Sequence, residues 1–69
     1  MNTATDEYSD YCFLMQAAID MEAAWLAHDS TRSIDIANSL QQRGYNEVPD
    51  SFLQTYAPVL FTSINHQLN

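Results

Sequence analysis

Apolar residues recur at three- and four-residue steps along most of the chain, which is the spacing of one face of an α-helix. The longest such segment contains no Gly or Pro and is rich in residues of high helix propensity, so we expect a helix over about residues 7–28. Its apolar stripe comprises Tyr8, Tyr11, Cys12, Leu14, Met15, Ala18, Ile19, Met21, Trp25 and Leu26. This stripe covers nearly half of the helix circumference and predicts contact with two neighbours. A second copy of the chain is a candidate for one of them.

Polar residues mark the ends of this first helix. Thr5 or Asp6 can accept a hydrogen bond from the first turn, so we expect one of them to cap the helix and residues 1–5 to be frayed. His28 suits the other end, because a protonated ring is favourable at the negative C-terminal end of a helix.

A second helix is predicted over residues 31–43. Asp29 or Ser30 is suited to cap it, since short polar side chains accept hydrogen bonds from the first turn. Gly44 is expected to end the helix in the left-handed conformation, which glycine adopts at the lowest cost. Tyr45 then packs back on the helix. The apolar positions are Ile34, Ile36, Ala37 and Leu40.

A third helix is predicted over residues 50–67, with Asp50 as its cap or Pro49 as its first residue. Its apolar stripe comprises Leu53, Ala57, Leu60, Phe61, Ile64 and Leu68. Pro58 interrupts the segment, because proline removes one backbone hydrogen bond. The stripe keeps its phase across the proline, so we expect one kinked helix; two short helices meeting at Ala57 are the alternative.

Together these elements predict an all-α fold, a three-helix mini-bundle that forms a single domain over residues 1–69. A chain of 69 residues buries only about 60% of its unfolded surface, and small domains compensate with disulfides, metals or oligomerisation. The single cysteine, Cys12, excludes an internal disulfide, and with His28 and His66 it gives no zinc-binding spacing. We therefore expect a homodimer with no cofactor or metal.

Several aromatic and apolar residues are surplus to a single small core. Phe52, Tyr56 and Val59 lie on a second face of the third helix and are the first candidates for a dimer or partner surface. Phe13 stands among polar residues of the first helix, and Tyr45 follows the second helix. These two residues are further candidates for the same surface.

Three charged residues complete the candidate surface. Glu22 falls inside the apolar stripe of the first helix. It therefore either reaches water at the edge of the stripe or pairs with Arg32 or Arg43, within the chain or across a dimer, because burying an unpaired carboxylate is costly. The two arginines are also suited to setting the register of a complex through carboxylates of the partner.

The net charge of −7, with no Lys, opposes binding to nucleic acid or to an anionic membrane surface, which require clustered basic residues. It favours basic protein partners. The carboxylates are scattered, which argues against DNA mimicry, and the helical segment around 31–43 carries too few basic residues for a DNA-binding helix-turn-helix. No apolar run approaches the roughly 20 residues of a membrane span, and residues 1–6 do not resemble a signal peptide. We expect a cytoplasmic protein.

No combination of residues predicts an enzyme. Cys12 and His28 lie more than about four turns apart on one helix and cannot meet within a chain, and a single glycine cannot form a phosphate-binding loop. The Asp29-Ser30 pair is similar to the modified serine of acyl carrier proteins. However, Thr31 stands where that family has Leu, and a predicted helix replaces the family's preceding loop, so Ser30 is better interpreted as a helix cap.

In length, charge balance and helix layout, the whole chain resembles the small acidic helical proteins that bacteriophages express early to block host proteins. This group includes anti-CRISPR proteins and a dimeric quorum-sensing anti-activator that binds the regulator LasR and the pilus-assembly ATPase PilB. The resemblance implies a stoichiometric inhibitor of a host protein, such as a LasR-type transcriptional regulator or a PilB-type ATPase. The alternatives are an accessory structural subunit of a larger complex and an acyl-carrier-like protein.

Overall fold

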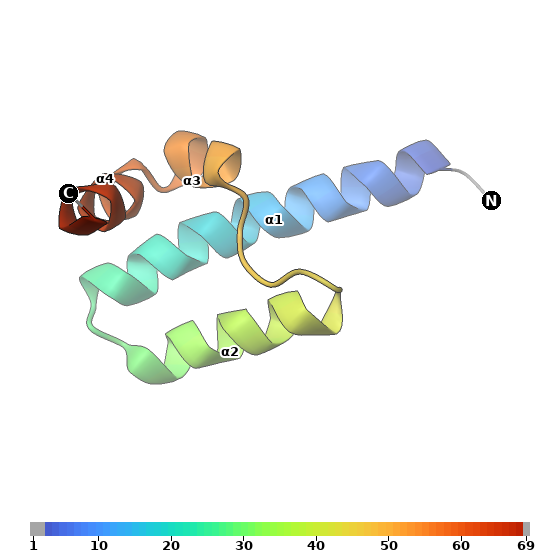
Figure 1. Cartoon of the computed structure of the whole chain (residues 1–69). Coiled ribbons are helices and arrows are strands. Elements are labelled where there is room, and N and C mark those ends of the chain that lie inside the picture. Colours follow the sequence, from blue (N-terminus) through green and yellow to red (C-terminus); the bar gives the residue numbers. More distant parts are fainter. Residues whose placement is uncertain (1–2, 69) are drawn as a thin grey trace.

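The computed structural model describes the backbone of residues 3–68 and the side chains of residues 8–65. It consists of four helices, and none of the described residues forms a strand, so the predicted all-α class is confirmed. The helices are α1 (Thr3–Leu26), α2 (Ser30–Gln42), α3 (Asp50–Tyr56) and α4 (Pro58–Leu68). Helix α1 runs through the whole molecule, which measures 43 Å in its longest dimension (Figure 1).

Helix α1 begins earlier than the sequence pattern predicts. It includes Thr5 and Asp6, so neither residue is a cap, and residues 3–5 are helical rather than frayed. The physical reason is that nothing between Thr3 and the predicted start opposes a helix, since this stretch contains no Gly or Pro. Met1 and Asn2 lie outside the described residues.

Helix α1 ends at Leu26 through a backbone turn centred on His28. His28 has a φ of 56°, in the left-handed region that usually selects glycine. The His28 N–H donates to the Trp25 carbonyl (3.2 Å), and the Asp29 N–H donates to the Ala24 carbonyl (2.9 Å), which is the pattern of a Schellman motif. His28 therefore marks the end of the helix as expected, but it does so through its backbone conformation.

Helix α2 begins and ends as its sequence indicates. The Arg32 N–H donates to Asp29 Oδ1 (3.0 Å), so Asp29, rather than Ser30, is the cap. Gly44 has a φ of 92°, and the Tyr45 N–H donates to the Leu40 carbonyl (2.9 Å) in a second Schellman motif. The half-buried Tyr45 ring packs against the core, which confirms its predicted return to the bundle.

The prediction of one kinked helix over residues 50–67 is wrong, because α3 and α4 are separate helices that meet at Ala57. Ala57 has a φ of −139° and a ψ of 56°, outside the helical region. A residue that precedes proline is disfavoured in the helical conformation, which explains the break, and Pro58 becomes the first residue of a new helix. At the start of α3 the cap position is occupied by Pro49, and Asp50 is the first helical residue.

The core lies between α1 and the elements on either side of it. Helix α2 packs against one side, and α3 and α4 pack against the other, so α1 has two neighbouring faces within one chain. The segment between α2 and α3 crosses α1 (Figure 1) and buries Val48, which is 1% exposed. The buried cluster comprises Leu14, Ala17, Ala18, Leu40, Val48, Leu53, Ala57 and Leu60. The N-terminal end of α1 projects beyond the other helices (Figure 1).

Candidate protein-binding surface

Glu22 projects from α1 onto the beginning of α4. Its Oε2 accepts hydrogen bonds from the backbone N–H groups of Val59 (2.9 Å) and Leu60 (3.1 Å). Pro58 has no N–H group, and the N–H of Ala57 donates back to α3. All the backbone donors at the start of α4 are thereby accounted for. Glu22 is thus a helix cap that is supplied by a different helix.

Within the chain, Glu22 pairs with neither Arg32 nor Arg43. Arg32 instead lies 3.4 Å from Asp20, and Arg43 lies 3.3 Å from Asp10, measured between nitrogen and carboxylate oxygen. Both pairs join α1 to the α2 segment, where the side chains remain substantially exposed. The arginines therefore connect helices of one chain, and such exposed pairs contribute little to stability, about 0–1 kcal/mol each.

Phe13 belongs to the contact between α1 and α2. Its ring is half-buried against the core, and the Arg43 guanidinium carbon lies 4.3 Å from the ring centroid. This geometry is that of a cation–π interaction. Phe13 is therefore half-buried, although Ser9 and Gln16 on the same face of α1 are exposed.

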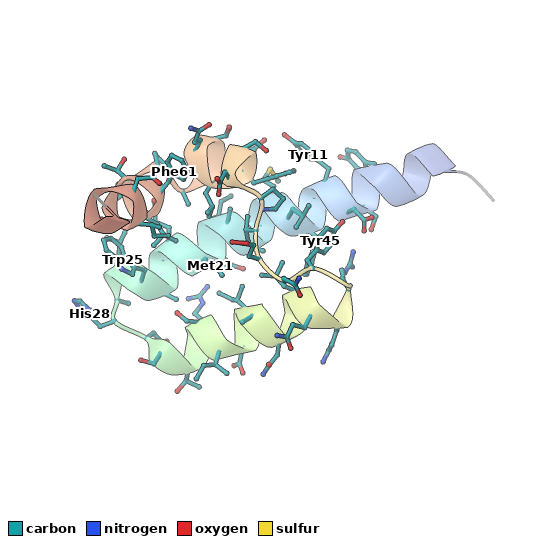
Figure 2. The ribbon with its side chains drawn as sticks, viewed as in Figure 1. Tyr11, Met21, Trp25, His28, Tyr45 and Phe61 are labelled. Atoms are coloured by element: carbon teal, nitrogen blue, oxygen red, sulfur yellow. The ribbon has the colours of Figure 1, made fainter. Side chains whose placement is uncertain are left out.

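Three aromatic rings gather where α1 meets α3. Tyr11 rises from α1 towards α3 (Figure 2), and its ring centroid lies 5.1 Å from that of Phe52 and 6.3 Å from that of Tyr56. The hydroxyl groups of Tyr11 and Tyr56 are hydrogen-bonded to each other. The rings border a hollow of about 180 Å³ that opens to solvent, here called the aromatic notch. It is lined by Tyr11, Ser51, Phe52, Thr55 and Tyr56.

The hydroxyl contact affects the ionisation of Tyr56. The hydrogen bond with Tyr11 raises the pKa of Tyr56 above its ordinary value of 10.0, and partial burial and the neighbouring Tyr11 and Cys12 groups act in the same direction. Cys12 similarly raises the pKa of Tyr8, one turn earlier on α1, chiefly through a hydrogen bond. Both phenols are therefore protonated at neutral pH.

The remaining predicted surface residues lie apart from the aromatic notch. Val59 is 50% exposed at the beginning of α4, next to the backbone groups that Glu22 caps. Tyr45 lies between α1 and α2 (Figure 2) and belongs to the packing around the core. The structure thus brings Phe52 and Tyr56 together with Tyr11, and it separates them from Val59 and Tyr45.

A further apolar surface follows α1 on the side away from α2. We call it the outer edge of α1, and it comprises Tyr8, Cys12, Met15, Ile19 and Leu26. Three of these side chains are well exposed: Tyr8 at 71%, Ile19 at 41% and Leu26 at 57%. These residues were predicted as part of the apolar stripe of the first helix, but not as a separate surface. The signal was the alternating four- and three-residue spacing that these residues form together with Glu22, which is typical of a helix–helix seam.

A second hollow lies at the corner between α1 and α2. It has a volume of about 390 Å³ and is lined by Ala24, Trp25, His28, Asp29, Ser30, Ser33 and Ile34. The His28 side chain points away from the bundle (Figure 2). Within the described part of the chain, no three His, Cys, Asp or Glu residues are grouped to hold a metal ion. His66 lies outside the residues whose side chains are described.

No protein-family model, no curated protein and no solved structure matches this chain. None of the described helices has the length and apolar character needed to cross a bilayer. The fold and its surfaces therefore define a small acidic helical domain, and its function has to be inferred from those surfaces.

Proposed function

We propose that this chain is a dimeric protein-binding module that blocks a surface of another protein by stoichiometric binding. The observation that supports it best is the outer edge of α1, an apolar surface that the chain leaves uncovered along several helical turns. Contiguous exposed apolar surfaces on small proteins mark contacts with other proteins.

A second copy of the chain is the proposed occupant of the outer edge. The alternating four- and three-residue steps from Tyr8 to Leu26 match the spacing with which two helices interdigitate. Glu22 falls on the same spacing, but its carboxylate is already bound by two N–H groups of α4. These hydrogen bonds persist when the edge is covered, and they lower the cost of covering the carboxylate.

The other surfaces remain available to a target protein. A net charge of −7 favours a basic surface on the target and accelerates association through electrostatic steering. The aromatic notch offers the aromatic anchor that commonly dominates the affinity of an interface. By its whole-chain resemblance, we propose a phage-encoded anti-activator in the host cytoplasm, with a LasR-type regulator or a PilB-type ATPase as the class of target.

Affinity capture from bacterial host lysate, followed by mass spectrometry, tests this function. The proposal predicts that the wild-type chain retains a host protein in a fixed molar ratio. A folded Tyr56→Ala variant should lose most of that protein, whereas Ile34→Ala, which alters an exposed residue of α2, should retain it. Equal retention by both variants would exclude the notch as the anchor, and no retained protein would contradict the function. An isolated chain that is insoluble or unfolded would favour an accessory subunit.

A further inference from the structure

The three rings of the aromatic notch present their faces at different angles. Tyr11 and Phe52 are inclined by 58°, Phe52 and Tyr56 by 34°, and Tyr11 and Tyr56 by 85°. The centroid separations of 5.1–6.3 Å hold the rings as neighbours around the hollow. Because an aromatic ring carries partial negative charge on its faces, a hollow bordered by several rings attracts a cation.

The polar groups of the notch also match a cationic donor. The hydroxyls of Tyr11 and Tyr56 are joined by one hydrogen bond. Because each phenolic oxygen has two lone pairs, the two hydroxyls can still accept further hydrogen bonds. The Thr55 hydroxyl donates to the Ser51 carbonyl (2.9 Å), which commits its only proton. None of the residues lining the notch carries a positive charge that would repel a cation.

The charge distribution of the chain favours the same occupant. Asp50 immediately precedes Ser51 and is exposed in the first turn of α3. The chain has two basic side chains, and both are already paired, Arg32 with Asp20 and Arg43 with Asp10. The fold also contains one example of the contact in question, because the Arg43 guanidinium lies over an aromatic ring at 4.3 Å.

We propose that the aromatic notch binds an arginine side chain of a basic segment on the target protein. Arginine suits the notch better than lysine, because its planar guanidinium stacks on ring faces while its N–H groups point sideways to acceptors such as the Tyr11 and Tyr56 hydroxyls. This inference rests on the proposed function and specifies the chemistry of the contact.

Titration of the full chain with blocked tripeptides, followed by NMR, tests the inference without requiring the target. The peptides are Gly-Arg-Gly, Gly-citrulline-Gly and Gly-norleucine-Gly, of which citrulline keeps the shape of arginine without its charge. The arginine peptide should shift the ring signals of Tyr11, Phe52 and Tyr56 with millimolar affinity. It should bind roughly three-fold or more tightly than the citrulline peptide, as an exposed cation–π contact provides.

A matched pair of variants locates the binding. Tyr11→Leu removes one ring of the notch, whereas Ile34→Ala shortens an exposed side chain of α2 that lies outside the notch and outside the outer edge of α1. Tyr11→Leu should weaken binding of the arginine peptide roughly three-fold or more, and Ile34→Ala should leave its affinity unchanged. Tyr11→Phe keeps the ring and should retain most of the binding.

Three outcomes overturn the inference. They are the absence of ring shifts with the arginine peptide, equal affinity for the arginine and norleucine peptides, and equal effects of Tyr11→Leu and Ile34→Ala. The second outcome would make the notch an apolar anchor site and leave the proposed function intact. Failure of the proposed function is seen separately, as the absence of a captured host protein.

Discussion

The capping of α4 by Glu22 is the contact of this fold whose removal has the most specific consequences. One carboxylate oxygen receives the N–H groups of Val59 and Leu60, at 2.9 and 3.1 Å. A lost helix cap costs about 1 kcal/mol, and a negative charge at a helix N-terminus contributes about 0.3–1 kcal/mol. Because Leu60 is buried, its N–H group loses its partner where water has little access, which adds to the cost. Glu22→Ala should therefore destabilise the chain by about 2 kcal/mol.

The neutral variant separates the charge from the hydrogen bonds. Glu22→Gln keeps a side-chain oxygen that can accept from the same N–H groups but removes the negative charge. Glu22→Gln should lose less stability, about 0.5–1 kcal/mol, because only the interaction with the helix dipole and the charge-assisted part of the hydrogen bonds disappear. In a domain of this size, each kcal/mol lowers the midpoint of thermal unfolding by roughly 4–8 °C.

Urea unfolding followed by circular dichroism, at one fixed protein concentration, measures these differences. Glu47→Ala is the control, since it removes a carboxylate of the same charge from an exposed position in the connector. Hydrogen exchange adds a local measurement, because the amides of Val59 and Leu60 should lose protection in Glu22→Ala. If Glu22→Ala and Glu47→Ala have the same stability and the Leu60 amide keeps its protection, Glu22 does not stabilise the start of α4.

The other predictions concern the two Schellman turns, the connector and the tyrosine pair. His28→Gly should stabilise the chain by about 0.5–1 kcal/mol, because His28 adopts a positive φ of 56° that glycine reaches without strain. Gly44→Ala should destabilise the chain by about 1 kcal/mol through backbone conformation alone, since an added Cβ meets nothing within 4 Å. Thermal unfolding measures both variants. Shifts of the same sign would contradict the assignment of both turns to the left-handed conformation. Val48→Ala should cost about 2 kcal/mol in urea unfolding because Val48 is 1% exposed, and a cost below about 0.5 kcal/mol would show that the connector does not pack as described. The raised pKa of Tyr56 means that its contribution to stability is complete below pH 10.0 and is lost as the pH rises through the higher folded value. A tyrosinate absorbance titration should therefore show two late-titrating phenols, Tyr8 and Tyr56, and Tyr56→Phe should remove one of them.

Features that depend on neighbouring residues could be predicted from the sequence. Asp29 accepts from the N–H group of Arg32, three residues further on, and Gly44 ends a helix whose last carbonyls lie within one turn. Both effects act through local backbone geometry, which the residue type largely determines. The break at Ala57 is also local, but the continuous apolar stripe across Pro58 favoured a single kinked helix in the prediction.

Features that depend on contacts between distant segments could not be predicted. Glu22 binds N–H groups 37 and 38 residues further along the chain, and backbone donors have no signature in the sequence. Val48 lies in a connector, and its burial follows from the path of that connector across α1 (Figure 1). Phe13 was assigned to a polar face because the polar residues around it, among them Asp20, were not recognised as facing α2.

The candidate surface was predicted in part for the same reason. The pattern identified Phe52 and Tyr56 as surplus aromatic residues, but the pairing of helices decided that Tyr11 joins them in one notch. The spacing that defines the outer edge of α1 was present in the sequence. However, the apolar stripe of this helix is so wide that the pattern alone did not separate the outer edge from the buried face. Only the positions of α2, α3 and α4 separate its buried part from its exposed part.

Sedimentation equilibrium of the purified chain tests most directly the claim that the outer edge of α1 is covered by a second copy. The wild-type chain should sediment as a dimer. Ile19→Asp, which places a charge in the middle of this edge at a side chain that is 41% exposed, should sediment as a monomer with unchanged helix content. A wild-type chain that remains monomeric, or an Ile19→Asp variant that remains fully dimeric, would contradict the account.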